Sequence, residues 1–264
     1  MDTAHTPEAI ALPSPWSDSS VAIVVPTYNE RDNMRELLDR VAALPLTNLR
    51  VIIVDDGSPD GTADEAELIG KEFTESRPDF VTVLRRTTKD GLGRAYIAGF
   101  GLALSTDADY IVQMDADLSH PPEYIPALLG GLLSTGASMV IGSRYVSGGS
   151  LADEWKLHRR FLSGWANVYV NTILGLHIRD ATAGFKIWTR EALVAAELDN
   201  LHSQGYSFQV EMNYVTKLAG GKIVEIPIRF HERSAGVSKM SLNVKIESAK
   251  LPFRLRFGGR RKRA

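Results

Sequence analysis

The chain of 264 residues contains no cysteine. Disulfide bonds, thiolate nucleophiles and zinc sites with cysteine ligands are therefore excluded. Long apolar runs are also absent, because no stretch of the sequence approaches the roughly 20 residues that a helix needs to span a bilayer. The N-terminal segment contains Asp2 and Glu8 and lacks the basic start and apolar core of a secretory signal. These absences predict a cytoplasmic protein.

A strong overall charge is absent as well. The formal net charge is -2 and the isoelectric point is about 6.3, which argues against a general binder of polyanions such as nucleic acid. The charge is nevertheless uneven, because residues 245–264 contain eight Lys or Arg residues and a single acidic residue, Glu247. We therefore define residues 245–264 as a basic C-terminal tail with a local charge of about +7.

The first 20 residues are rich in Pro, Ser, Ala and Thr, a composition typical of a flexible leader or linker. We expect order to begin at Val21 and one domain to extend over residues 21–244. Within it, short β-branched runs at 21–25, 51–54, 81–84, 110–114 and 139–141 alternate with segments of helical periodicity. This alternation predicts an α/β fold with a Rossmann-like, mainly parallel sheet and helices on both faces. Residues 159–174 and 206–218 are further predicted helices, residues 222–228 a strand, and residues 230–241 a polar loop.

The most informative segment is Asp115-Ala116-Asp117, which follows the predicted strand 110–114. Acidic side chains at the carboxyl edge of an α/β sheet lie where such folds bind ligands. Two carboxylates separated by one residue can hold a hard divalent cation, which can in turn bind a diphosphate. The segment therefore points to a substrate that carries phosphate groups.

Three other segments leave predicted strands at the same edge. Residues 26–30 open a helix with Asn29 as a candidate N-cap, so simple capping is an alternative to ligand binding there. Asp55 and Asp56 suit hydrogen bonding to a base or ribose, or support of a nearby metal. Residues 89–94 contain two glycines, which fit close backbone packing as well as ligand contact, and Lys89 and Arg94 can assist an anionic ligand.

Basic residues follow where a phosphate-rich site would need them. Arginine binds phosphate oxygens through two parallel hydrogen bonds, and lysine supplies a point charge. An ordinary solvated surface is the alternative for these positions, and it is favoured for Arg160 and Arg229. The basic candidates are Arg144, Arg159, Arg160, Arg229, Arg233 and Lys239.

The order of these motifs resembles that of family 2 glycosyltransferases. The motifs read VPTYNE at 25–30, VDDGSPDGT at 54–62, GLG at 91–93, DADLSHPP at 115–122, GSRY at 142–145 and DATAGFK at 180–186, followed by the late loop from Arg233 to Lys239. The set is most similar to dolichol- or polyprenol-phosphate mannosyltransferases and extends over about residues 21–241. The resemblance implies a GT-A type fold and a nucleotide-sugar donor.

The resemblance also implies roles for individual residues. Asp115 and Asp117 would engage the diphosphate and a divalent cation, Mg²⁺ or Mn²⁺. Ser119 stands where relatives commonly have Gln, and its shorter side chain would reach the metal through water. Asp117, Arg144 and Arg159 would serve catalysis, with Arg159 facing the acceptor phosphate and Arg160 equally placed for that role. The implied nucleotide-sugar-binding residues are Pro26, Tyr28, Glu30, Ile53, Asp55, Asp56, Asp115, Ala116, Asp117, Arg144, Arg233 and Lys239.

The implied reaction is inverting transfer of mannose from GDP-mannose to a polyprenyl (dolichyl-type) monophosphate, which gives β-mannosyl phosphoryl polyprenol and GDP. Transfer to a hydroxyl normally needs a general base. A monophosphate has a second pKa of about 6 and is largely a dianion near pH 7. Such an enzyme can omit the base and instead align two mutually repelling phosphate groups with basic residues and a metal.

A lipid acceptor implies peripheral association with the cytoplasmic face of a membrane. The basic tail could lie on anionic lipid, or it could be a disordered solvated tail; attachment through a membrane-protein partner or a fused membrane domain is a third possibility. Two other functions stay open at this point. One is a related transferase that uses UDP-glucose or another nucleotide sugar. The other, from a different class, is a receiver-like signalling module. Asp55 and Asp56 directly follow a predicted strand, which is similar to the acidic pocket of receiver domains.

Overall fold

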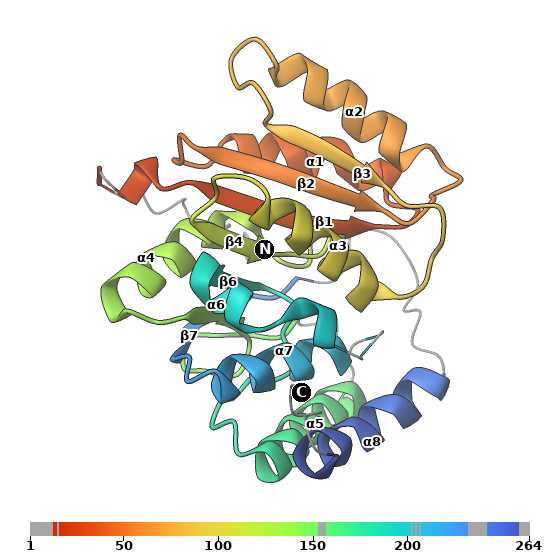
Figure 1. The fold of residues 1–264 in the computed structure, drawn as a ribbon, viewed down its shortest axis with the longest axis vertical. Helices are drawn as coiled ribbons and strands as arrows, with labels where there is room; N and C mark the ends of the chain where they lie inside the picture. Colours follow the sequence, from red (N-terminus) through yellow and green to blue (C-terminus); the bar gives the residue numbers. More distant parts are fainter. Residues whose placement is uncertain are drawn as a thin grey trace, which may run out of the picture.

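The structure is a computed structural model. It describes residues 13, 14, 16–152, 157–201, 203, 205, 207–231 and 242–258, with the backbone alone for residues 157–161 and 242–248. The described residues form one seven-stranded sheet with helices on both faces (Figure 1). The α/β fold class predicted from the sequence is therefore confirmed.

The strands lie in the order β3-β2-β1-β4-β6-β5-β7 across the sheet. Their bounds are β1 (Val21–Thr27), β2 (Leu49–Asp55), β3 (Val81–Arg85), β4 (Tyr110–Gln113), β5 (Met139–Ser143), β6 (Lys186–Thr189) and β7 (Ile223–Pro227). Strand β6 pairs antiparallel with both β4 and β5, and the other pairs are parallel. Strand β6 was not predicted from the sequence, because a four-residue strand that starts with a buried lysine shows no apolar alternation.

The helices are connected to these strands along the chain. Their bounds are α1 (Arg31–Ala42), α2 (Thr62–Phe73), α3 (Leu92–Leu104), α4 (Ile125–Thr135), α5 (Leu157–Leu174), α6 (Arg190–Ala195), α7 (Ser207–Leu218) and α8 (Leu242–Phe257). Short 3₁₀ helices lie at η1 (Trp16–Asp18), η2 (Pro122–Tyr124) and η3 (Leu198–Asn200). None of the described helices is both long and apolar enough to cross a membrane.

Alternation of side chains along β1 divides the core into two layers. Ile23 and Val25 pack on one face of the sheet with the buried residues of α1, α2 and α4. Ala22 and Val24 point to the other face and pack with buried residues of α3, α6 and α7. Both faces are covered, so β1 is apolar on both sides, as expected for a central parallel strand.

Helix α3 approaches the sheet closely because of Gly99. A Cβ atom at Gly99 would lie 2.3 Å from Cγ1 of Val24 and 2.8 Å from Cγ2 of Val54. Only glycine leaves room for this approach, since cores are close-packed and an added carbon forces a shift. The helix is thereby fixed against β1 and β2, with its first residue, Leu92, directed to the carboxyl edge of the sheet.

Both ends of the predicted domain differ from the sequence analysis. Order begins before Val21, because the main-chain N–H of Thr47 donates to the carbonyl of Ser17 and the Asn48 side chain donates to the carbonyl of Asp18. At the other end, α8 crosses the boundary predicted at residue 245, and the alternative of a disordered tail does not hold for residues up to 257. The remaining domain boundaries stay predictions.

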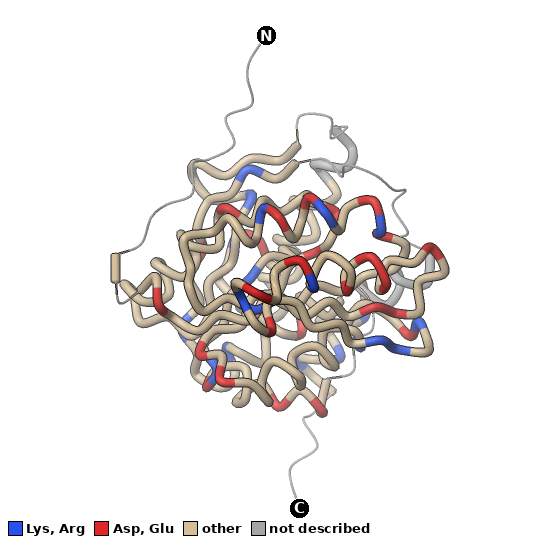
Figure 2. The backbone as a smooth tube through the Cα atoms, turned by 90° about the horizontal axis from the view of Figure 1, so that it is seen from above, with Lys and Arg blue, Asp and Glu red and all other residues tan. Residues whose placement is uncertain are grey.

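Lys and Arg residues are interspersed with Asp and Glu residues along the backbone (Figure 2). Several form exposed pairs, such as Arg35 with Glu72 and Arg85 with Asp64. Exposed pairs of this kind contribute little to stability.

Lys186 is an unusual member of the core, because its side chain is completely buried. Its Nζ donates to the main-chain carbonyl of Gln209 at 2.9 Å and to Gln209 Oε1 at 3.0 Å. Burial lowers the pKa of Lys186 to about 7, although the charge of Asp180 opposes this shift. The amine is therefore largely neutral above neutral pH in the folded protein and still charged in the unfolded chain.

This difference predicts a pH-dependent stability term. Between about pH 7 and pH 10 the unfolded state binds a proton that the folded state does not, so the contribution of Lys186 to stability increases with pH, by up to about 1.4 kcal/mol per pH unit. A Lys186→Met variant lacks this term, so the free energy of unfolding of the wild type should increase relative to that of the variant from pH 7 to pH 9. Urea unfolding of both proteins at several pH values measures the difference, and parallel curves would contradict the assignment.

Candidate active site

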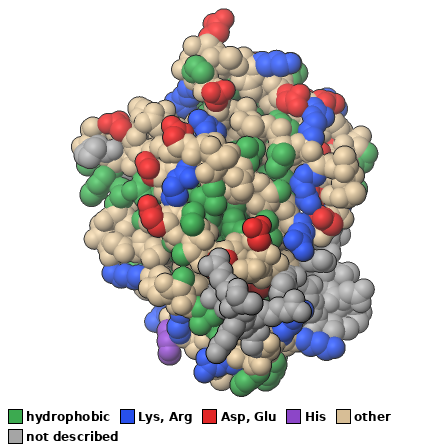
Figure 3. Space-filling view, viewed as in Figure 1, with side chains coloured by type: hydrophobic (Ala, Val, Ile, Leu, Met, Phe, Trp, Pro, Cys, Tyr) green, Lys and Arg blue, Asp and Glu red, His purple; other side chains and the backbone are tan. Residues whose placement is uncertain are grey.

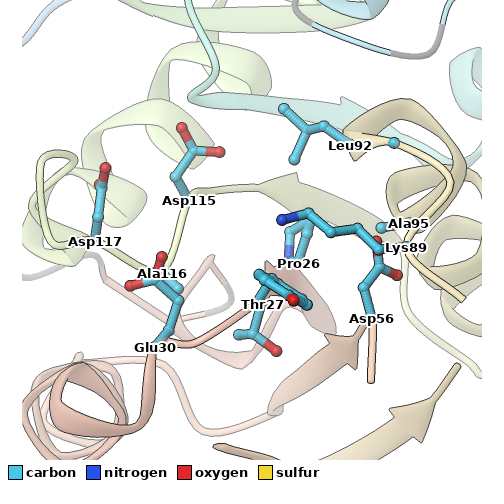
Figure 4. A pocket seen from close by; sticks show the side chains of 12 residues that line it. Pro26, Thr27, Glu30, Asp56, Lys89, Leu92, Ala95, Asp115, Ala116 and Asp117 are labelled. Carbon is cyan, nitrogen blue, oxygen red and sulfur yellow. The ribbon is translucent and has the colours of Figure 1, made fainter. Parts of the chain in front are cut away.

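A cleft lies at the carboxyl edge of β1, β2 and β4. It is lined by Pro26, Thr27, Tyr28, Glu30, Asp56, Lys89, Gly91, Leu92, Ala95, Asp115, Ala116 and Asp117 (Figure 4). Eight of the residues selected from the sequence lie in this lining: Pro26, Tyr28, Glu30, Asp56, Lys89, Asp115, Ala116 and Asp117. The prediction that the loops following separate strands lie at one edge of the sheet is therefore confirmed.

Parallel strand pairing explains why these loops meet. In the sheet, Thr27 of β1 is opposite Asp55 of β2, and Val24 of β1 is opposite Gln113 of β4. The residues that follow each strand consequently leave at the same edge. The turn after β4 includes Leu118 with φ of 59°, a left-handed conformation that sends the chain away from the cleft after Asp117.

Asp115 and Asp117 are the central pair of the cleft. Their carboxylates point to the same side of the segment, on either side of Ala116 (Figure 4). Asp117 is 5% exposed, and its Oδ1 accepts hydrogen bonds from the main-chain N–H and the hydroxyl of Ser119, at 3.1 and 2.6 Å. Ser119 is itself buried, so it holds the Asp117 carboxylate in one orientation.

The donor set fits a hard divalent cation. Asp115 and Asp117 offer oxygen atoms, the ligand type that Mg²⁺ and Mn²⁺ prefer. In the part of the chain that the structure describes, no group of three or more His, Cys, Asp or Glu side chains forms a complete cation cage. A Mg²⁺-type site with one or two carboxylates, completed by phosphate oxygens and water, matches this arrangement.

The opposite wall of the cleft carries a cation on an aromatic ring. Lys89 Nζ lies 3.4 Å from the centroid of the Tyr28 ring, within the range of a cation–π contact. Lys89 also projects across the middle of the cleft in Figure 4. A positive group thus faces the same space as Asp115, and an anionic ligand with a planar base can use both Lys89 and Tyr28.

Asp56 extends the cleft along β2. It forms an ion pair with Arg86, which also pairs with Asp90. Burial raises the pKa of Asp56, and Arg86 opposes this shift by charge and hydrogen bonding. The Asp56 carboxylate is therefore a partly buried acceptor whose position is fixed by Arg86.

Comparison with known proteins now decides the family. The family model "Glycosyl transferase family 2" matches residues 22–195. The chain belongs to glycosyl transferase family 2. It is 45% identical over 222 residues to the undecaprenyl-phosphate mannosyltransferase of Micrococcus luteus, covering 84% of this chain and 87% of that protein.

Two further comparisons agree with this assignment. The chain is 44% identical over 220 residues to the polyprenol monophosphomannose synthase of Mycolicibacterium smegmatis, covering 83% of this chain and 80% of that protein. Among solved structures, glucosyl-3-phosphoglycerate synthase of Mycobacterium tuberculosis, crystallised with Mn²⁺, UDP and glucosyl-3-phosphoglycerate, matches with a TM-score of 0.64. At 18% identity, with 92% of this chain and 82% of that chain covered, this likeness confirms the GT-A type of fold. A receiver-like signalling module is ruled out, since the chain is a glycosyltransferase.

Other residues selected from the sequence lie outside the cleft lining of this glycosyltransferase. Ile53 is completely buried in the core. Asp55 accepts hydrogen bonds from Thr27, at 3.1 Å, and from the main chain and hydroxyl of Ser58. It therefore ties the β2 loop to β1.

Residues 26–30 do not have the capping arrangement that the sequence left open as an alternative to ligand binding. Asn29 is not the N-cap of α1, because the cap position is Glu30, and Asn29 has φ of 57°. Asparagine tolerates this left-handed conformation better than most residues. The main-chain N–H of Asn29 donates to the hydroxyl oxygen of Ser58 at 3.0 Å. The loop after β2 therefore fixes the conformation of residues 26–30, which present Tyr28 and Glu30 to the cleft.

Arg144 forms a buried ion pair instead of lining the cleft. Its guanidinium donates to both carboxylate oxygens of Asp180, at 2.8 and 2.7 Å, and to the hydroxyl of Thr182 at 2.9 Å. Burial lowers the pKa of Arg144, but the hydrogen bond and the charge of Asp180 outweigh this effect and raise it. Asp180 is completely buried, so the pair fixes the DATAGFK segment to the end of β5.

The remaining predicted site residues lie outside what the structure describes. Arg233 and Lys239 belong to residues 232–241, and the side chain of Arg159 lies among those not described. No role was assigned from the sequence to Thr27 or Ala95, which line the cleft, or to Tyr96, whose hydroxyl donates to Asp115. Thr27 lies inside a predicted motif, but Ala95 and Tyr96 read only as apolar positions of a helix, and no polar signal in the sequence pointed to them.

The Arg144–Asp180 pair yields a stability prediction. An Arg144→Met variant should lose about 3–5 kcal/mol of stability, because it leaves the buried Asp180 carboxylate without a charged partner. An Arg144→Met, Asp180→Asn double variant removes both charges and should recover part of this loss. Denaturant unfolding measures both values, and a single variant as stable as the wild type would refute the structural role of Arg144.

Proposed function

We propose that this glycosyltransferase transfers mannose from GDP-mannose to a polyprenyl monophosphate, with inversion at the anomeric carbon. The observation that carries the proposal is the pairing of Asp115 and Asp117 with Lys89 and Tyr28 in one cleft. This arrangement offers a cation site, a positive group and a planar surface to a nucleotide sugar. The names of the two relatives at 45% and 44% identity, both polyprenyl-phosphate mannosyl transferases, support the acceptor and the sugar.

A divalent cation is part of the proposal. The structural neighbour from Mycobacterium tuberculosis contains Mn²⁺ with UDP, which supports a Mg²⁺ or Mn²⁺ ion held here by Asp115 and Asp117. When bound, such an ion neutralises charge on the departing diphosphate. Ser119 acts through Asp117, whose carboxylate it orients, because the Ser119 hydroxyl donates to that carboxylate.

The nucleotide would occupy the part of the cleft formed by the first two loops. Tyr28 offers a ring face to the base, and Asp56 offers an acceptor to a base N–H or a ribose hydroxyl. Lys89 lies between this part of the cleft and Asp115, where it can interact with phosphate oxygens (Figure 4). Pro26, Glu30 and Ala116 complete the wall.

The acceptor requires no general base, since a monophosphate is already largely a dianion near pH 7. One acceptor oxygen forms a bond to the anomeric carbon, the bond from that carbon to the GDP oxygen breaks, and GDP leaves with the electron pair. No proton is transferred in this step. Arg159, Arg233 and Lys239 are proposed to hold the acceptor and donor phosphates, so positioning and charge supply the catalysis.

Attachment to the membrane is proposed to use one face of α5 and α8, which lie side by side (Figure 1). Trp165 stacks on Tyr169, Tyr169 contacts Phe253, and Phe253 stacks on Phe257. Trp165, Phe253 and Phe257 are at least half exposed. This aromatic row, together with the exposed Lys250, Arg254 and Arg256, is termed the aromatic–basic face.

The composition of the aromatic–basic face suits an anionic bilayer surface. Tryptophan and tyrosine favour the level of the lipid headgroups, and each basic residue near an anionic surface contributes roughly 1 kcal/mol. Hydrophobic and basic side chains are both exposed at the end of the molecule that carries these helices (Figure 3). The face would keep the enzyme near its lipid acceptor at the cytoplasmic side of a membrane.

A transfer assay tests the reaction. The protein is incubated with labelled GDP-mannose, Mg²⁺ or Mn²⁺ and a polyprenyl phosphate, and label should enter the organic phase as a β-mannosyl phosphate, identified by NMR. Asp117→Ala should lower the rate at least 100-fold while the thermal midpoint stays within a few degrees, because a cation ligand is lost at a cleft-facing position. Transfer from UDP-glucose in place of GDP-mannose would refute the donor, and an α-linked product would refute inversion.

Liposome flotation tests the membrane proposal. The chain should float with vesicles that contain anionic lipid at low salt and lose most of this binding at 1 M salt, where the Debye length is about 3 Å. Replacing Trp165 and Phe257, two exposed members of this face, by serine should weaken binding several-fold. The matched control replaces the similarly exposed Leu68 and Val194, which lie on other helices, and equal losses in both variants would exclude the aromatic–basic face.

A further inference from the structure

One oxygen of Asp115 has a fixed partner behind the cleft. The hydroxyl of Tyr96, on α3, donates to Asp115 Oδ1 at 2.8 Å. Tyr96 is completely buried, whereas the Asp115 side chain is 27% exposed. Asp115 thus faces the cleft on one side and receives a hydrogen bond from the protein interior on the other.

The ring of Tyr96 has little freedom to move this hydroxyl. It stacks on Phe208 with ring centroids 5.7 Å apart and planes 4° apart, and it also stacks on Phe100. Its helix is locked at Gly93, where a Cβ atom would lie 2.5 Å from the carbonyl oxygen of Ser203. The donor position is therefore set by the packing of α3 and α7, independently of any ligand.

The second oxygen of Asp115 lies in a narrow slot. Oδ2 is 3.9 Å from Nδ1 of the buried His120. A Cβ atom at Gly184 would lie 3.2 Å from the same oxygen and 3.4 Å from Cε1 of His120. The absence of a side chain at Gly184 therefore leaves space for the Asp115 carboxylate. Through Gly184, the DATAGFK segment forms one wall of the space around this carboxylate.

A network of buried polar side chains extends from Tyr96 into the core. The Gln113 side chain interacts with the Tyr96 hydroxyl, an interaction that lowers the pKa of Tyr96 against the larger raising effects of burial and Asp115. Gln113 Nε2 donates to Gln209 Oε1 at 2.7 Å, and Lys186 Nζ donates to the same oxygen. This network links β4, α3, α7 and β6 and reaches the cleft at Asp115.

Stability alone does not account for these buried polar groups. Replacing a hydrogen-bonded pair by apolar groups of the same shape is often nearly neutral, whereas a half-satisfied network is costly. Metal-binding carboxylates, in contrast, depend on partners that fix their orientation. The network extends from the core to one carboxylate of the cleft, as a supporting role for that carboxylate requires.

We propose that Tyr96 is a positioning residue that holds the Asp115 carboxylate in the orientation required for the divalent cation of the nucleotide-sugar site, and that Gln113 and Gln209 hold Tyr96 in turn. This inference rests on the proposed function only in taking Asp115 as a cation ligand. It does not depend on the identity of the sugar, the base or the acceptor.

Direct measurement of Mn²⁺ binding tests the inference. The dissociation constant is measured by calorimetry for Mn²⁺ alone and in the presence of GDP or UDP, for the wild type and for Tyr96→Phe. Loss of a supporting partner of a metal ligand typically costs at least 10-fold in affinity, so the constant should increase roughly 10-fold in Tyr96→Phe. Tyr110→Phe, which removes a hydroxyl at the opposite end of β4, is the matched control and should bind Mn²⁺ as the wild type does.

Two further readouts separate positioning from a purely structural role. A high Mn²⁺ concentration should restore most of the transfer activity of Tyr96→Phe, and the metal-free thermal midpoint should change by no more than a few degrees. Gln209→Leu should show a smaller loss of Mn²⁺ affinity that is not additive with Tyr96→Phe, since both act on one network.

Each outcome decides the inference separately from the proposed function. An unchanged Mn²⁺ constant in Tyr96→Phe, or a loss of thermal stability with unchanged binding, would overturn the positioning role. Absence of Mn²⁺ binding to the wild type would overturn it as well. Wild-type protein that binds Mn²⁺ but does not use GDP-mannose would refute the proposed donor and leave the comparison of Tyr96→Phe with Tyr110→Phe valid.

Discussion

Parallel pairing of β1 with β2 and β4 is the constraint on which the site depends. It brings the ends of three strands to one edge, so residues about 30 and 90 positions apart in the chain share a cleft. Close packing of α3 at Gly99 then adds a fourth segment, which carries Lys89 and Leu92. A fold of this kind places polar groups on loops while the apolar strands beneath them keep those loops in register.

The charge of the cleft follows from this arrangement. Glu30, Asp56, Asp115 and Asp117 all line it, and a diphosphate would be repelled by such a set in the absence of a cation. Lys89 offsets part of this negative charge, and a divalent ion at Asp115 and Asp117 would offset more. The acidic cleft is thus consistent with a ligand that brings phosphate groups and metal together. The buried contacts of Ser119 and Tyr96 keep two of these carboxylates from rotating away.

Much of the fold was predictable because it depends on periodicity. The alternation of β-branched runs with helical spacing identified β1 to β5, β7 and most of the core. The carboxyl-edge rule predicted that the loops after the strands share one edge, and the family resemblance selected seven of the residues that line the cleft there. Strand β6 was not predicted, because a lysine in the sequence indicates an exposed position. Lys186 is buried only because its Nζ donates hydrogen bonds to Gln209. Arg144 was selected as a phosphate ligand from its charge, its place after a predicted strand and the resemblance of its GSRY motif, whereas its pairing with Asp180 depends on a contact across 36 residues. Tyr96 was not selected, since an aromatic residue on a helix gives no sign that its hydroxyl reaches a carboxylate.

The proposed reaction requires Asp115 and Asp117 to form a cation site for the diphosphate of a nucleotide sugar. A crystal structure of the chain with Mn²⁺ and GDP would show this site. We expect a Mn²⁺ ion within about 2.2 Å of a carboxylate oxygen of Asp115 or Asp117 and bound to the GDP diphosphate, with the base next to Tyr28. Clear density for GDP in a different part of the molecule, or with the ion away from both carboxylates, would contradict it.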